Sequence, residues 1–100
     1  MRDNDLLAGL IRLHILHHAS KEAVFGLWII EELGRHGYKL SPGTLYPLLH
    51  GLEEKGYLSS TPKRAGSTYR RMYRITARGR RALNGAHVKV RELFGEMFAQ

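Results

Sequence analysis

The chain has 100 residues, 43% of them hydrophobic, which suffices for one small domain with a buried core but not for a second, pocket-bearing lobe. It has no cysteine, which excludes disulfides and thiolate zinc sites, and no apolar run as long as a membrane span, so we expect a cytoplasmic protein without a membrane partner. The formal net charge of +7 favours a polyanionic partner, of which nucleic acid is the commonest.

The first predicted helix covers residues 5–18 and is apolar on more than one side. Because one stripe of a helix cannot hold so many aliphatic residues, we expect one side to pack on its own domain and another on a second chain. The sequence therefore predicts a homodimer in which this helix takes part. The aliphatic residues are Leu6, Leu7, Leu10, Ile11, Leu13, Ile15 and Leu16.

Three histidines, His14, His17 and His18, lie in the second half of this helix. His14 and His18 are one helical turn apart, so a metal site is conceivable. No cysteine or carboxylate is placed nearby in the sequence to complete it, and the favoured interpretation is surface or interface histidines. Metal binding stays open as the alternative, and we assign no metal ligand and no cofactor.

The second helix is predicted over roughly residues 21–35, because Ser20 stands where a capping residue would stand and Gly37 ends the pattern. Trp28 lies toward the side of its apolar face. Core packing is the favoured role of this indole, and the stacking of a planar hydrophobic ligand is the alternative. The apolar face is formed by Phe25, Ile29 and Leu33.

The third helix carries the strongest local signals in the chain. Ser41 can cap its first turn and Pro42 fits the first helical position, whereas Pro47 would remove a hydrogen bond and clash with the preceding turn. We therefore expect the regular helix to start near Thr44 and to end at Gly56. One face is formed by Leu45, Leu48, Leu49 and Leu52.

Strands are predicted at residues 57–61 and 69–75, with residues 62–68 supplying the turn of a hairpin. Alternation along the second strand turns Tyr73 and Ile75 inward and puts another set of side chains on the opposite face. That outer set is Arg70, Met72 and Arg74.

Positive charge is concentrated in and after the hairpin, because no Asp or Glu occurs between Glu54 and Glu92. A contiguous basic surface of this kind suits the phosphates of a nucleic acid, and a solvated basic face without a partner is the alternative. The basic residues of the stretch are Lys63, Arg64, Arg70, Arg71, Arg74, Arg78, Arg80 and Arg81.

The last helix is predicted over about residues 77–98, with Thr76 as its cap. Its apolar residues repeat with a spacing near 3.5, which is typical of helices that pair. We therefore divide the chain into a nucleic-acid-binding domain at residues 1–76 and a C-terminal dimerisation helix at residues 77–100. The repeat consists of Leu83, Ala86, Val90, Leu93, Phe94 and Met97.

The run from Gly43 to Pro47 (Gly-Thr-Leu-Tyr-Pro), followed by Tyr73-Arg74-Ile75-Thr76 and Gly79, resembles the PadR family of winged-helix transcriptional regulators. The resemblance extends over roughly residues 6–98. It implies a mostly helical winged helix-turn-helix, in the order helix, helix, helix, strand, strand, helix, with the last helix added for dimerisation. It also implies a homodimeric regulator of transcription on a palindromic operator, more often a repressor, with relief by a small hydrophobic effector as a further expectation.

Three groups of site residues follow. The predicted DNA contacts are Ser41, Thr44, Tyr46, Pro47, His50, Lys63, Arg64, Arg70 and Arg74. The predicted dimer interface uses Leu6, Leu10, Leu13, Leu83, Val90, Phe94 and Met97. The candidate residues for a flat hydrophobic ligand are Trp28, Phe94 and Phe98.

Other function classes are less well supported. No nucleophile with a base and an orienting carboxylate is present, and the adjacent pairs Glu31-Glu32 and Glu53-Glu54 point in different directions on a helix, so we expect no enzyme activity. A protein-interaction module would call for an apolar or acidic exposed face. RNA recognition relies on exposed aromatic residues over a sheet, whereas this hairpin offers mainly arginine.

Overall fold

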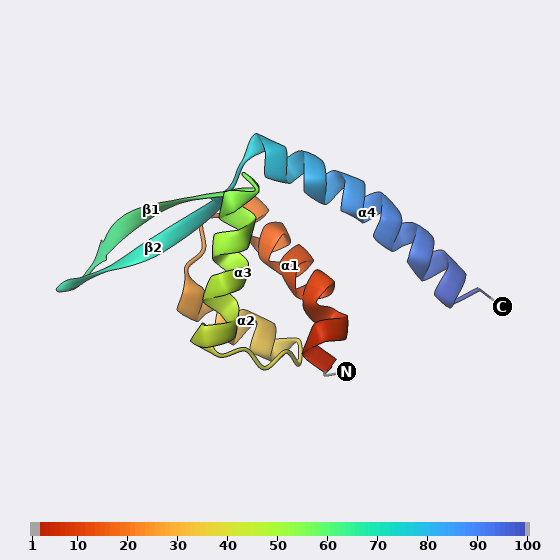
Figure 1. Ribbon diagram of the computed structural model, residues 1–100, viewed down its shortest axis with the longest axis horizontal. Coiled ribbons are helices and arrows are strands. Elements are labelled where there is room, and N and C mark those ends of the chain that lie inside the picture. Colours follow the sequence, from red (N-terminus) through yellow and green to blue (C-terminus); the bar gives the residue numbers. More distant parts are fainter. Residues whose placement is uncertain (1–2, 100) are drawn as a thin grey trace.

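The computed structural model describes residues 3–99, and it contains three helices, a two-stranded hairpin and a fourth helix that projects away from the rest (Figure 1). This order confirms the predicted, mostly helical winged helix-turn-helix with an added C-terminal helix. None of the helices in residues 3–99 is long and apolar enough to cross a membrane. The elements are α1 (Asp3–Lys21), α2 (Gly26–Arg35), α3 (Pro42–Glu54), β1 (Leu58–Ala65), β2 (Thr68–Ile75) and α4 (Ala77–Met97).

The connection between α1 and α2 differs from the prediction. Ser20 does not cap a second helix but lies inside α1, where its Oγ donates a hydrogen bond to the carbonyl of His17 at 2.5 Å. The chain then becomes extended, and Val24 pairs with Tyr73 through N···O contacts of 2.9 and 2.7 Å. These two bonds and the burial of Val24 against the hairpin explain why α2 begins only at Gly26.

Helix α3 begins at Pro42 rather than near Thr44, so the predicted start was wrong. The side chain of Ser41 accepts a hydrogen bond from the amide of Thr44 at 3.3 Å, as a cap should. Pro47 lies inside the helix. The helix tolerates this proline because its buried leucines hold it on the core, namely Leu45, Leu49 and Leu52.

The hairpin is longer and its turn shorter than predicted. Leu58 lies opposite Ile75 and Ala65 opposite Thr68, so only Gly66 and Ser67 form the turn. Pro62 belongs to β1, which is an edge strand and therefore tolerates a residue without an amide proton. This hairpin of β1 and β2, called the wing from here on, thus carries its basic residues on strands and not in a loop.

The core lies between α1, α2, α3 and the base of the hairpin, where α2 and α3 pack as the paired helices of the helix-turn-helix unit (Figure 1). Its largest fully buried side chains come from all five of these elements, β1 and β2 included. They are Ile11, Ile15, Ile29, Leu33, Leu45, Leu49, Leu58 and Tyr73.

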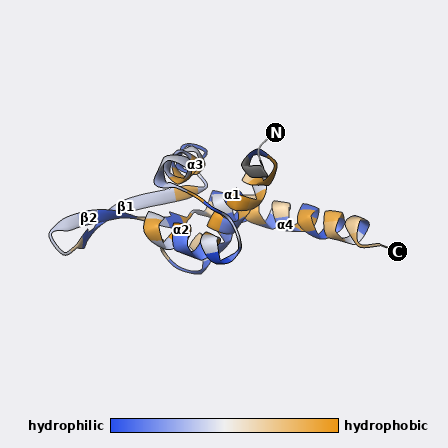
Figure 2. Cartoon of the chain, turned by 90° about the horizontal axis from the view of Figure 1, so that it is seen from below, coloured by the Kyte–Doolittle hydropathy of each residue, from blue (hydrophilic) through white to orange (hydrophobic). Residues whose placement is uncertain are grey.

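Helix α4 has the predicted cap, because the Thr76 Oγ1 accepts a hydrogen bond from the amide of Gly79 at 2.9 Å. Gly79 is its only buried residue among those described. Figure 2 shows hydrophobic residues along α4 as far as its C-terminal end. The distal half of this helix therefore presents apolar side chains that the described part of the protomer does not cover.

Candidate nucleic-acid interface

The exposed side of α3 and the hairpin enclose a shallow groove. Tyr46 and His50 lie one turn apart on α3, with their ring centroids 6.4 Å from each other, and both line this groove. The opposite wall comes from the start of α2 and from the wing, including Tyr69 and Arg70. Aromatic, imidazole and guanidinium groups therefore meet on one concave surface.

Tyr46 reaches across this groove to the start of α2. Its side chain is 38% exposed, and its hydroxyl lies against Gly26 so closely that a Cβ at that position would overlap it and lie 2.8 Å from Cζ of the tyrosine ring. Gly26 is therefore required by the close approach of Tyr46. This contact joins α3 to α2 without burying the tyrosine.

The remaining predicted contacts of α3 fall on two sides. Ser41 and Thr44 are exposed at the first turn, and their hydroxyl oxygens are 3.3 Å apart. Pro47 is also exposed but lines a different hollow, with Leu48 and residues of α1 and α4. The structure thus brings Tyr46 and His50 together beside the wing, whereas Pro47, the next residue after Tyr46, faces the neighbouring hollow.

One face of the hairpin is tied to α3. The Ser60 hydroxyl donates to the Glu53 carboxylate at 2.8 Å, and the Arg71 Nε donates to Ser60 Oγ at 2.9 Å. Burial and the Glu53 carboxylate raise the pKa of Tyr73, which belongs to the same face. Sequence reasoning did not select Arg71 as a site residue, although strand alternation from the buried Tyr73 would have placed it on the side of α3.

The opposite face of the hairpin carries Arg70 and Arg74, as alternation predicted. The guanidinium carbon of Arg70 lies 4.1 Å from the ring centroid of Phe25, which holds this side chain beside the start of α2. Arg74 is exposed near the base of the hairpin. These two arginines therefore do not share the face of the wing that packs on α3.

The distal half of the hairpin holds Lys63 and Arg64, both exposed on β1. Arg64 lies over the ring of Tyr69 at 5.7 Å, and its Nη1 donates to the tyrosine hydroxyl at 3.3 Å. Lys63 lies opposite Arg70 in the strand register and Arg71 lies opposite Pro62, so with Arg64 four positive charges lie in the distal half of the wing. No acidic residue lies on either strand to neutralise them.

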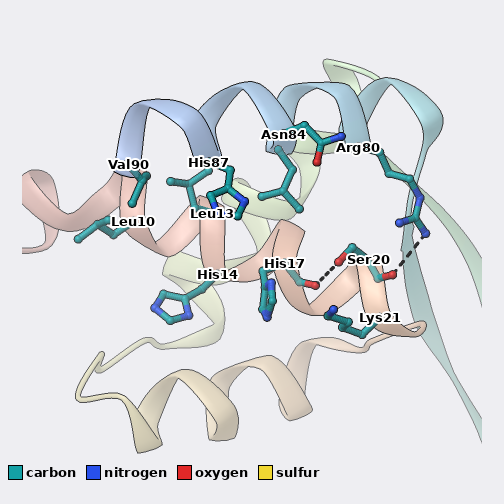
Figure 3. A pocket seen from close by; sticks show the side chains of 11 residues that line it. Leu10, Leu13, His14, His17, Ser20, Lys21, Arg80, Asn84, His87 and Val90 are labelled. Atoms are coloured by element: carbon teal, nitrogen blue, oxygen red, sulfur yellow. Dashed lines mark hydrogen bonds between the residues drawn. The ribbon is translucent and has the colours of Figure 1, made fainter. Parts of the chain in front are cut away.

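The predicted dimer residues lie on α1 and α4, on either side of a groove lined by Leu10, Leu13 and Val90 (Figure 3). Leu13 and Leu83 are half-buried, whereas Leu10 and Val90 are exposed. The exposed fraction rises toward the ends of the helices. It reaches 71% at Leu6, 62% at Phe94 and 66% at Met97.

The three candidate ligand residues do not come together within one chain. Trp28 is half-buried on α2, with its ring edge-on to His18 at 5.3 Å. Phe94 and Phe98 lie at the far end of α4, where their ring centroids are 4.7 Å apart. Their role in ligand binding stays a prediction.

The histidines of α1 form a cluster that the sequence did not predict. His14 and His18 are joined by His36, from the end of α2, whereas His17 is exposed. Glu32 lies 3.8 Å from His18 and 3.2 Å from His36, so the expectation that no carboxylate stands nearby was wrong. That carboxylate was missed because it comes from the neighbouring helix, 14 residues beyond His18 in the chain (32 − 18).

Burial and the neighbouring histidines lower the pKa of His14. Burial also lowers the pKa of His18, and the Glu32 carboxylate opposes this shift. Partial removal from water raises the pKa of Glu32 itself, but hydrogen bonds from His36 and Arg35, with the charges of His18 and Arg35, outweigh that effect and lower it.

Comparison with known proteins identifies the family. The family model described as the transcriptional regulator PadR-like family matches residues 15–85. The chain is 49% identical to the transcriptional regulator Rv3488 of Mycobacterium tuberculosis over 87 residues, which is 87% of this chain and 81% of that protein. The prediction of a function other than catalysis is confirmed, because the family and this relative are regulators of transcription.

Solved structures give the same result. A PadR family regulator from Eggerthella lenta superposes with a TM-score of 0.82 at 29% identity, over 96% of this chain and 88% of its own. A PadR-like transcription factor from Bacteroides fragilis also gives a TM-score of 0.82, at 25% identity, over 94% of this chain and 92% of its own. The chain belongs to the PadR-like family of transcriptional regulators.

Proposed function

We propose that the protein binds double-stranded DNA sequence-specifically as a homodimer and represses transcription from a palindromic operator. The observation that carries this proposal is the pair Tyr46 and His50, exposed on α3 beside a hairpin whose distal half is positively charged and free of acid. A helix of this diameter fits the major groove, and a basic hairpin beside it fits the adjoining phosphates.

Within this arrangement the residues divide by role. Thr44, Tyr46 and His50 enter the major groove, where hydroxyl, phenol and imidazole groups can bond to base edges, and Pro47 borders it. The remaining contacts hold phosphates and position the protein without reading sequence. Those residues are Ser41, Lys63, Arg64, Arg70 and Arg74.

The apolar sides of α1 and α4 support the homodimer. An exposed apolar surface that runs along two helices of a small domain favours association, and a two-fold dimer would present two copies of α3 to two half-sites. Repression would follow from occupation of a promoter. A small hydrophobic effector that enters beside Trp28, Phe94 or Phe98 would relieve it by changing the dimer.

The choice of nucleic acid can be measured with gel shifts on three probes of equal length. We expect tight binding to the operator duplex and weak binding to single strands and to structured RNA, because the wing offers arginine and not a platform for stacking bases. Stronger binding to RNA would favour the RNA-binding alternative. Absence of binding to all three probes would favour a protein-interaction module.

The wing is tested by removing charge from its distal half. Replacing both Lys63 and Arg64 with Ala should weaken binding to all duplexes alike. The slope of log K against log salt concentration should also become less steep by up to about 1.8, because each phosphate contact contributes about 0.9 to it. The matched control removes Lys89 and Arg91, two exposed charges on α4. Equal slopes for the wing variant and wild type would exclude backbone contacts by these residues.

Tyr46→Ala should lose specific binding while the fold persists, because the side chain is exposed and lies off the buried leucine stripe of α3. A good specific contact contributes about 1–3 kcal/mol, or roughly 5- to 150-fold in operator affinity. Tyr46→Phe removes only the hydroxyl, so its operator affinity separates the contribution of the hydroxyl from that of the ring. Thermal melting of the same variants is the control, since a large fall in Tm with unchanged affinity per folded dimer would assign Tyr46 to packing against Gly26.

A further inference from the structure

Two pairs of polar side chains face each other where α1 and the end of α2 meet. His14 and His18 are four residues apart on α1, and Glu32 on α2 lies four residues before His36, the C-cap of that helix, so the members of each pair are neighbours. The nitrogen ligand atoms of the three histidines all lie within 4.8 Å of one another. Three imidazoles thus converge where the two helices meet, and the Glu32 carboxylate lies next to two of them.

The carboxylate of Glu32 lies beside two of these histidines. Its Oε2 lies 3.2 Å from Nε2 of His36 and 3.8 Å from Nε2 of His18, while its Oε1 accepts a hydrogen bond from Nη1 of Arg35 at 2.9 Å. Two ligands of one tetrahedral zinc ion stand about 3.4 Å apart when each bond is about 2.1 Å. The nitrogen–oxygen separations are therefore already close to those around a shared ion.

We propose that His14, His18, His36 and Glu32 bind one divalent transition-metal ion, with Zn²⁺ as the best fit, and that this ion joins α1 to α2. Imidazole and carboxylate ligands suit Zn²⁺, and the absence of thiolates and the scarcity of oxygen donors disfavour copper(I) and magnesium. The histidine nitrogens, which lie within 4.8 Å of one another, would reach the separation of about 3.4 Å by rotation of the imidazoles about their side-chain torsions. Arg35 acts on the second carboxylate oxygen and orients Glu32 toward the histidines.

This inference does not depend on DNA binding, but it concerns two functionally distinct helices. Helix α1 carries leucines of the proposed dimer face, and α2 is the first helix of the helix-turn-helix unit. An ion shared by both would add a direct link between them to the packing of the buried core. Metal binding would therefore stabilise the fold.

The competing explanation is aromatic packing without an ion. The rings of His14 and His36 stack at 5.1 Å, and Tyr38 lies edge-on to His14 at 5.3 Å. Such packing needs no carboxylate and does not require ring nitrogens to converge. The two explanations therefore differ in whether the wild-type chain binds one ion and in whether Glu32→Gln lowers the affinity for it.

The site can be measured with the full chain, prepared without a histidine tag and treated with a chelator that is then removed. Titration with Co²⁺ is expected to saturate at one ion per chain and to quench the fluorescence of Trp28, the single tryptophan, whose ring lies 5.3 Å from that of His18. Zn²⁺ should then displace Co²⁺ and restore the emission. Calorimetry with Zn²⁺ alone gives the affinity.

Variants identify the ligands. His36→Gln leaves the His14 and His18 pair intact and should weaken Zn²⁺ binding at least about 10-fold, and Glu32→Gln should weaken it by about 10- to 100-fold. The matched controls are His17→Gln and His87→Gln, which remove exposed histidines outside the cluster and should bind Zn²⁺ as the wild type does.

Thermal melting with and without Zn²⁺ supplies a second measurement that does not use tryptophan. The Tm of the wild type and of both controls should rise with Zn²⁺, and that of His36→Gln should not. Wild-type chain that binds no ion, or binding that His36→Gln and Glu32→Gln leave unchanged, would overturn the proposal. Equal weakening by the two control variants would do the same, because it would indicate scattered binding to surface histidines.

Discussion

A chain that ends at Gly85 is expected to be monomeric or insoluble and to lose most of its affinity for a palindromic operator. The truncation removes the distal half of α4, whose apolar residues are exposed in the protomer. Without the second protomer each recognition helix binds alone, and the gain from simultaneous engagement of two half-sites, about 100-fold or more, disappears. Size-exclusion chromatography with light scattering and a gel shift measure both effects.

A point substitution makes the same test without shortening the chain. Phe94→Glu places a charge on the apolar side of α4, and because Phe94 is 62% exposed the protomer should still fold. Val88→Glu is the matched control, since Val88 is similarly exposed at 68% but lies on the opposite side of the helix. A soluble, monodisperse dimer from the truncated chain, or equal dissociation by the two glutamates, would contradict an interface built on this side of α4.

The sequence was sufficient where the signal for a structure is local. Ser41 and Thr76 cap helices as predicted, and the leucine spacing of α3 correctly separates buried Leu45 and Leu49 from exposed Tyr46. Each of these features depends on residues within one or two turns. Composition and periodicity can therefore detect them.

The errors arose where distant segments meet. The pairing of Val24 with Tyr73 keeps the chain extended between α1 and α2, so that α2 begins only at Gly26. No local signal in the sequence near Val24 predicts this pairing. Pro62 favoured a turn by its own propensity, but the register of β1 with β2 extends the strands past it to a turn at Gly66 and Ser67. Tertiary pairing overrode local propensity in both places.

The candidate sites follow the same division. The spacing of His14 and His18 on one helix was visible in the sequence, but the approach of Glu32 and His36 depends on how α2 crosses α1. Likewise the exposure of Tyr46 was predictable, whereas its contact with Gly26 was not. The face on which a side chain of one element lies can be predicted from the sequence. A contact between side chains of two elements can be predicted only when the packing of those elements is known.

Gly79→Ala is expected to cause a large loss of stability, because Gly79 lies where α4 leaves the hairpin and has no room for a side chain. A Cβ there would overlap the carbonyl oxygen of Tyr57 and lie 2.7 Å from Cγ1 of Ile75. The same carbonyl accepts a hydrogen bond from the amide of Thr76 at 3.0 Å, so relief of the overlap must disturb the cap of α4. Overpacking against backbone costs about 1–3 kcal/mol, or more where the neighbour cannot move.

Gly85→Ala provides the control within the same helix, because no atom lies within 4 Å of a Cβ at that position. Replacing an unconstrained helical glycine with alanine stabilises by about 0.5–1 kcal/mol, so the two variants should shift Tm in opposite directions. For a chain of this size a loss of about 2 kcal/mol lowers Tm by roughly 10 °C, measured at one protein concentration because the proposed dimerisation would also contribute. If Gly79→Ala instead melted like Gly85→Ala, the start of α4 would not be held against the α3–β1 connection, and no close contact would fix α4 relative to the hairpin.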